Sequence, residues 1–199
     1  MNNAISRRTF LKCAGTAAVA VGAASMLGGC SLFDNIINAG TKEMPTITMD
    51  GVTFTVTGAF TQATTTKNEN GETKTVNAVV PLVGIIDGNQ VVSSNPRTVS
   101  KSNFKLTIDG VEAAVKVDPD ARTTVKALVG DEGEKGLRTL NNKGQLTLDG
   151  GLASVALVFV PKQPIEKWSK AVLTISYSNR SQNFELTYQS DSETDVVKK

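Results

Sequence analysis

Few side chains of this chain suit catalysis. Its 199 residues include no histidine and two cysteines, Cys13 and Cys30. The absence of imidazole excludes histidine metal ligands, Ser-His-Asp triads and histidine acid–base catalysis. Zinc, blue-copper and iron–sulfur centres need more thiolate or imidazole ligands than the chain supplies. We therefore expect no cofactor, and carboxylates are the main groups left for an enzyme.

Cys30 follows an apolar segment and is preceded by Leu27, Gly28 and Gly29. A thiolate is the nucleophile that readily takes a diacylglyceryl group. The four residues resemble the lipobox of bacterial lipoproteins, in which the cysteine is acylated and becomes the first residue, although that family more often has Ala, Ser or Thr in place of Gly28. Because two or more acyl chains hold a protein stably at a membrane, the resemblance implies a lipid anchor without a membrane-spanning helix. The alternative is an ordinary cleavage site beside an unrelated cysteine.

Residues 6–12 read S-R-R-T-F-L-K and resemble the twin-arginine export signal of bacteria. The positions that carry this resemblance are Arg7, Arg8, Phe10 and Leu11. Residues 13–29 are rich in Ala and Gly and are marginal as a permanent membrane span. The resemblance implies that the twin-arginine translocase and lipoprotein-processing enzymes handle the chain. It also implies a location on the extracytoplasmic face of the cell membrane.

Removal of residues 1–29 as a signal peptide changes the charge balance. The full chain has 21 basic and 19 acidic residues, and this segment holds three of the basic ones and no acidic one. The mature chain then carries 18 basic and 19 acidic residues, a net charge near −1. We therefore expect no basic field that attracts nucleic acid or anionic lipid.

The mature chain is expected to form one domain behind a short tether. Residues 30–45 contain the acylated cysteine and the tether, which Gly40 and Pro45 interrupt. Residues 46–189 form the domain, and residues 190–199 are polar and expected to be disordered. No disulfide is expected, because Cys13 leaves with the signal and Cys30 is acylated.

Alternating apolar and polar residues predict β-strands along the domain. The clearest case is Asp109-Gly110, which lies between the alternating segments 104–108 and 111–117. Asp-Gly favours the type I′ turn, whose twist matches two antiparallel strands. The same pair recurs at Asp50-Gly51, Asp87-Gly88 and Asp149-Gly150. These turns indicate an all-β, antiparallel domain.

Other segments have patterns of their own. Residues 76–86 are nearly all apolar, which predicts a strand buried on both faces, with a bulge or break at Pro81. Residues 61–74 are polar and contain a turn signal. Residues 123–129 are predicted as one more strand, and residues 134–141 as a short helical turn.

One family resemblance concerns the domain itself. It rests on residues 149–151 (D-G-G), 155–162 (V-A-L-V-F-V-P-K) and 173–175 (L-T-I). These segments resemble the telokin-like immunoglobulin-fold domain of bacterial extracellular lipoproteins. The resemblance implies an immunoglobulin-like antiparallel β-sandwich of about seven to nine strands at the cell surface. It implies no catalytic residue.

Two features are weak candidates for a binding site. Asp131, Glu132 and Glu134 are predicted to lie in a loop, where carboxylates suit Ca²⁺, but a solvated charged loop is the preferred interpretation. Trp168 lies in a polar connection, where a tryptophan either contacts a ligand or partner or folds back over the edge of the sandwich.

Taken together, the sequence predicts a lipid-anchored, non-enzymatic envelope protein whose β-sandwich is a binding or interaction module. Its partners would be the membrane, through the Cys30 lipid, and an unidentified envelope protein or polymer, but not nucleic acid. Two alternatives stay open. One is a small ligand-binding or sensory lipoprotein, and the other is an envelope enzyme that uses carboxylates.

Overall fold

The computed structural model describes seven segments of the chain: residues 44–67, 70–88, 96–134, 136–149, 152–165, 167–190 and 193–199. The export motif, the lipobox and Cys30 lie outside these residues. Within them no helix is long and apolar enough to cross a membrane.

The described residues form twelve β-strands, one long helix and a single 3₁₀ turn, and all strand pairs are antiparallel. The prediction of an all-β antiparallel domain is confirmed, with more strands than the seven to nine expected. The strands are β1 Thr46–Met49, β2 Val52–Lys67, β3 Thr73–Asp87, β4 Thr98–Ser100, β5 Phe104–Ile108, β6 Val111–Val115, β7 Gln145–Thr147, β8 Leu152–Ala156, β9 Phe159–Pro161, β10 Lys170–Tyr177, β11 Arg180–Ser190 and β12 Glu193–Lys198. The helix is α3 Asp120–Glu134, whose backbone is broken at Gly130 with a φ of 73°, and the 3₁₀ turn is η1 Lys101–Asn103.

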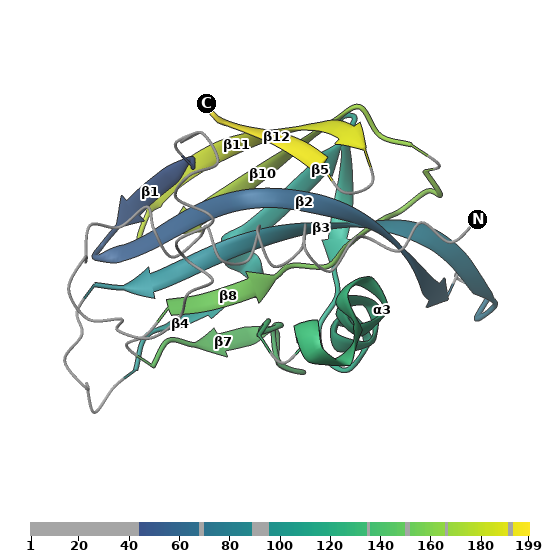
Figure 1. Cartoon of the computed structure of the whole chain (residues 1–199), viewed down its shortest axis with the longest axis horizontal. Coiled ribbons are helices and arrows are strands. Elements are labelled where there is room, and N and C mark those ends of the chain that lie inside the picture. Colours follow the sequence, from purple (N-terminus) through teal and green to yellow (C-terminus); the bar gives the residue numbers. More distant parts are fainter. Residues whose placement is uncertain are drawn as a thin grey trace.

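Ten strands belong to one sheet that curls into a nearly closed barrel (Figure 1). Their order is β1-β2-β3-β9-β6-β5-β10-β11-β12, with β8 paired to β3 beside β9. The curl brings β12 back to β2, where Thr194 Oγ1 donates a hydrogen bond to the Ala59 carbonyl at 2.6 Å. Lys198 Nζ donates to the Thr46 carbonyl at 3.1 Å and so links β12 to β1. Side chains therefore help to close this seam of the barrel.

Tight turns set the register of three hairpins. Asp109-Gly110 has φ angles of 48° and 85°, and Asp50-Gly51 has 50° and 76°, as a type I′ turn requires. Ser178-Asn179 forms a third turn of this kind, with φ angles of 46° and 62°, between β10 and β11. The predicted Asp109-Gly110 turn is confirmed. Asp87-Gly88 instead ends β3, and Gly88 N donates to the Gly51 carbonyl at 2.8 Å.

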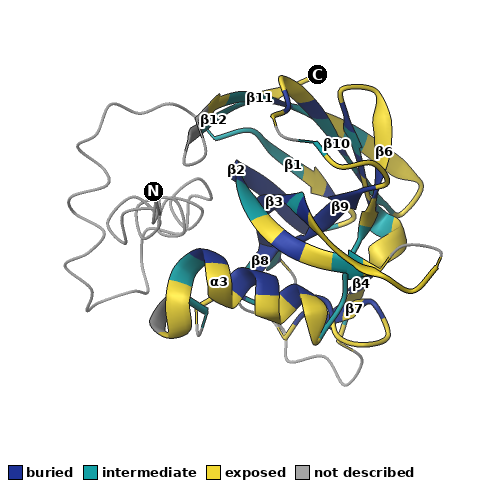
Figure 2. Ribbon diagram, turned by 90° about the vertical axis from the view of Figure 1, so that its right-hand side faces the viewer, coloured by how far each residue is buried: buried dark blue, intermediate teal, exposed yellow. Residues whose placement is uncertain are grey.

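The sheet is buried on both faces along β3. Inside the barrel, residues from both walls form the main core, which includes Phe54, Phe159 and Phe184. On the outer face a second core forms under α3, as Figure 2 shows, and joins Phe60 of β2 to Val125 of the helix. This arrangement confirms that residues 76–86 are a strand buried on both faces.

The strand predicted at residues 123–129 is wrong, because these residues belong to α3. Its buried positions Ala121, Val125 and Leu128 are spaced at i, i+4 and i+7, which is one face of a helix. The helical turn predicted at 134–141 is also wrong beyond Glu134, the last residue of α3. Thr123, Thr124 and Val125 are β-branched and favour a strand locally, so the helical spacing of the apolar residues was not recognised.

The β2–β3 hairpin is the longest feature of the sheet, with strands of 16 and 15 residues. Residues 61–67 and 73–74 lie in its strands, so most of the polar segment predicted around a turn is extended. The strand β3 continues through Pro81, which pairs with Ala59, so it has no break at this residue, but its pairing is irregular beside it. The partner of β3 changes there from β8 to β9, and β2 has a register shift between Val56 and Gly58, opposite Leu82 and Val83.

The C-terminal segment corrects another expectation. Residues 190–199 were expected to be disordered, but Glu193–Lys198 form β12 and pair with β11 from Phe184 to Ser190. Val196 packs against the main core, which the polar composition of the segment does not indicate.

Candidate functional site

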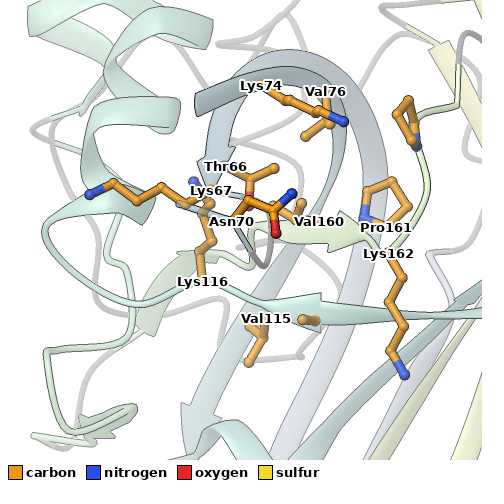
Figure 3. Close-up of a pocket in the computed structure, with 12 residues that line it drawn as sticks. Thr66, Lys67, Asn70, Lys74, Val76, Val115, Lys116, Val160, Pro161 and Lys162 are labelled. Carbon is orange, nitrogen blue, oxygen red and sulfur yellow. The ribbon is translucent and has the colours of Figure 1, made fainter. Parts of the chain in front are cut away.

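A groove of about 630 Å³ lies beside the outer end of the β2–β3 hairpin (Figure 3). It is bounded by this hairpin, by the end of β6 and by β9 with the residues that follow it. Its lining residues are Thr66, Lys67, Asn70, Lys74, Val76, Ala114, Val115, Lys116, Val160, Pro161, Lys162 and Pro164. The hairpin curls over the outer face of the sheet, and this curl brings its end close to β6 and β9.

The groove is basic. Among the residues that the structure describes, its lining contains four lysines and no carboxylate. Lys67, Lys74 and Lys162 are exposed, and among the residues that the structure describes none forms an ion pair with them. Glu72 is exposed on the same hairpin but does not line the groove.

Lys116 differs from the other three lysines because it holds the hairpin in place. Its Nζ donates hydrogen bonds to the Thr65 carbonyl and, at 3.5 Å, to Thr64 Oγ1 of β2. The same ammonium lies 4.0 Å from an Asp120 carboxylate oxygen. Lys116 therefore fixes one wall of the groove and has less of its charge available for a ligand.

The floor of the groove is apolar and packs against the outer core. Val76 and Val160 are buried and belong to the outer core under α3. Thr64 Oγ1 and Thr124 Oγ1 form a buried hydrogen bond of 2.8 Å, which joins β2 to the helix. This support gives the lysines a fixed base, and the arrangement suits binding of an anionic group by ammonium donors.

The proposed Ca²⁺ residues lie in the helical turn that follows a break in α3 at Gly130, so the predicted acidic loop is wrong. Asp131 Oδ1 pairs with Lys126 Nζ at 2.8 Å, and Glu134 Oε1 pairs with Arg122 Nη1 at 2.9 Å. Hydrogen bonding and attraction to Asp131 raise the pKa of Lys126. Glu132 belongs to the same helix, but its side chain lies outside the described residues. Within the described part of the chain, no three Cys, Asp or Glu side chains are grouped to hold a metal ion.

Trp168 is part of the barrel rather than of its surface. Its side chain is 3% exposed and packs in the main core. Its Nε1 donates to Thr61 Oγ1 of β2 at 2.9 Å, and its ring meets Tyr188 of β11 edge-on with 5.3 Å between centroids. Of the two roles weighed for this residue, the structure therefore favours the one that folds back over the sheet, at the seam between β2 and β11.

A cluster around Asp109 was not expected from the sequence. Its carboxylate accepts hydrogen bonds from the backbone N–H of Lys170 at 2.9 Å and from Ser169 Oγ at 2.7 Å. Partial burial raises the pKa of Asp109, but the bonds from Ser169 and Lys170 outweigh this effect and leave the pKa below its usual value. Asp109 thus ties the β5–β6 turn to the start of β10, which is a structural role.

The sequence patterns also did not identify the groove lysines as site residues. They come from residues 67 to 162 and share no local motif. The one available signal is the pair Lys67 and Lys74 on opposite sides of the Asn70-Gly71 turn, which a hairpin brings to one end.

Comparison of the chain with protein families, with curated proteins and with solved structures finds no match.

Proposed function

We propose that this protein is a lipid-anchored, non-enzymatic protein of the bacterial envelope whose β domain binds an anionic ligand in the basic groove. Cys30 carries the anchor, and the export signal around Arg7 and Arg8 directs the chain to the extracytoplasmic face of the membrane. The resemblance to telokin-like domains of extracellular lipoproteins supports the same location. The observation that carries the proposal is a groove whose described lining holds four lysines and no carboxylate.

Electrostatics favour an anion over other ligands. Lys67, Lys74 and Lys162 are exposed ammonium groups around one concave surface, so their fields add where a ligand would sit. An ammonium binds phosphate as a point charge and does not require the planar geometry that arginine imposes. The ligand class is therefore a phosphate-bearing or otherwise polyanionic molecule.

Inorganic polyphosphate is a suitable probe. Binding to the purified chain is measured by calorimetry for the wild type and for the triple variant K67Q/K74Q/K162Q. We expect the variant to bind roughly tenfold or more weakly, because each exposed ionic contact contributes up to about 1 kcal/mol.

The matched control is the triple variant K105Q/K143Q/R180Q. These three side chains are exposed and lie outside the groove lining, and the loss of charge is the same. Retention of binding in this control assigns the site to the groove. Equal weakening in both triple variants would show that only net charge matters and would reject the groove.

A further inference from the structure

We infer that the anionic ligand of the groove is the phospholipid headgroup layer of the same membrane that holds the lipid anchor. This inference rests on the function proposed above and names its ligand. It follows from three observations: the direction in which the chain enters β1, the length of chain before it, and the position of the lysines on the hairpin.

The chain enters the barrel from the side of the hairpin end. β1 is antiparallel to β2, with Thr46 opposite Thr55 and Met49 opposite Val52. The line of β1 continues upstream, because Val56 N donates to the Pro45 carbonyl at 3.1 Å. The described chain therefore begins, at Met44, on the side of β1 that faces the end of β2, and Figure 1 shows that β2 continues beyond β1 to the hairpin.

The lengths allow the anchor and the groove to reach one surface. Ten residues separate Thr57 from Lys67 along β2, which corresponds to about 33 Å. Fourteen residue steps separate Cys30 from Met44, and such a stretch spans at most about 50 Å. An anchor at Cys30 can therefore lie level with Lys67 without any change in the barrel.

The charge distribution orients the domain. The mature chain is close to neutral, so the whole molecule is not drawn to an anionic membrane. Its lysines at the groove nevertheless form a local basic surface on the hairpin end, which is the end toward the anchor. The tether allows this surface to approach the bilayer to within a Debye length, where anionic headgroups attract it. The hairpin end would then rest on the headgroups, and the β10–β11 turn would point away.

Vesicle binding of the full chain with Cys30→Ser tests this inference, because no acyl chain then holds the protein to the lipid. Vesicles of phosphatidylcholine are compared with an equimolar mixture of phosphatidylcholine and phosphatidylglycerol. Soluble polyphosphate is the third probe. We expect salt-sensitive binding to the anionic vesicles. At about 1 kcal/mol for each lysine, K67Q/K74Q/K162Q lowers this binding by on the order of a hundredfold. The control K105Q/K143Q/R180Q contains the same N-terminal basic residues as K67Q/K74Q/K162Q, so these residues cannot cause a difference between the two variants. We expect the control to bind anionic vesicles as tightly as the Cys30→Ser chain does.

The outcomes separate this inference from the function on which it rests. Polyphosphate binding that depends on the groove, without groove-dependent binding to anionic vesicles, would overturn the membrane inference and leave an anion-binding module for a soluble polymer. If K67Q/K74Q/K162Q binds both polyphosphate and anionic vesicles as tightly as the control variant does, the anion-binding function and the membrane inference are both overturned. Equal groove-dependent binding to neutral and anionic vesicles would also contradict the inference, because headgroup charge would then play no part.

Discussion

At the scale of single residues, Asp109 has two roles within one side chain. It occupies the first position of a type I′ turn with a φ of 48°, which Asp and Asn tolerate better than most residues. Its carboxylate also receives hydrogen bonds from Ser169 and Lys170, so the turn and the start of β10 are held together. The pKa of Asp109 is lowered as a result, and stability becomes linked to pH.

We expect Asp109→Asn to lower the free energy of unfolding by about 1 kcal/mol or less at neutral pH, because the residue is exposed and solvent screens its charge. Asn keeps the turn geometry and removes the charge. Since the folded pKa lies below the unfolded value, the carboxylate stabilises the fold above about pH 4, the unfolded pKa of Asp. This stabilisation is lost as the pH falls through the folded pKa. Urea denaturation of both proteins from neutral to acidic pH measures the difference.

Asp50→Asn is the matched control, because Asp50 has the same place in the β1–β2 turn and its carboxylate accepts a hydrogen bond from Ser178 Oγ. A smaller loss is expected there. A difference between wild type and Asp109→Asn that does not change with pH would contradict the role of the carboxylate charge.

The turn and the carboxylate cluster differ in how far the sequence could predict them. Asp109-Gly110 lies between alternating segments, so local pattern was enough to predict the turn. Ser169 is 60 residues away, and its hydrogen bond depends on how β5 and β10 pair. Local patterns carry no information on such long-range pairing.

At the scale of elements, α3 seals the outer face of the β2–β3 hairpin. Val125 is fully buried there with Phe60 of β2 and Val158. The buried Thr64–Thr124 hydrogen bond adds a polar contact to this apolar interface. The helix thus packs against the same outer core that contains Val76 and Val160 of the groove floor.

We expect Val125→Ala to lower the free energy of unfolding by roughly 2 kcal/mol, because it leaves a cavity between helix and sheet. Thermal and urea denaturation should each show one transition, since the outer core is continuous with β2 and β3.

Ala127→Glu is the control for this prediction. Residue 127 is exposed on the helix, so the change should cost no more than about 0.5 kcal/mol. In a strand, residues 125 and 127 would share one face, and the introduced carboxylate would enter the core. A large loss of stability on Ala127→Glu would therefore favour the strand that we first predicted for this segment.

The helix and β12 were not predictable for a shared physical reason. Thr123, Thr124 and Val125 are β-branched and favour strands locally, but the apolar face at 121, 125 and 128 packs against the sheet and decides for helix. In β12, pairing with β11 outweighs a polar composition. Tertiary contacts decided both segments.

At the scale of the whole molecule, anchoring and binding would act together. We expect Cys30→Ser to release the protein from the membrane fraction, or to leave it uncleaved, because no other thiol survives in the mature chain. Fractionation followed by mass spectrometry of the mature N-terminus measures this. An unmodified N-terminus at another residue in the wild type would contradict the lipid anchor.

The groove shows why composition alone misjudged the surface. The near-neutral mature chain led us to expect no basic field, yet folding gathers Lys67, Lys74 and Lys162 around one groove. Net charge is a sum over the chain and does not depend on where each charge lies. The local field depends on the curl of the hairpin over β6 and β9, which no short stretch of sequence encodes.

The short strand β1 has a mechanical consequence for a chain held through Cys30. Any pull on the tether enters the barrel at Met44 and passes along β1, whose residues Thr46–Met49 pair with β2. Ladder hydrogen bonds lie across the strands, so a force along β1 loads them all together in shear, whereas a force across it would break them one after another. Because Pro45 continues the line of β1, a pull toward the hairpin end is of the first kind. The four residue pairs of β1 and β2 then resist the force together. How long the domain withstands a pull on the tether depends on the rate at which this ladder unfolds.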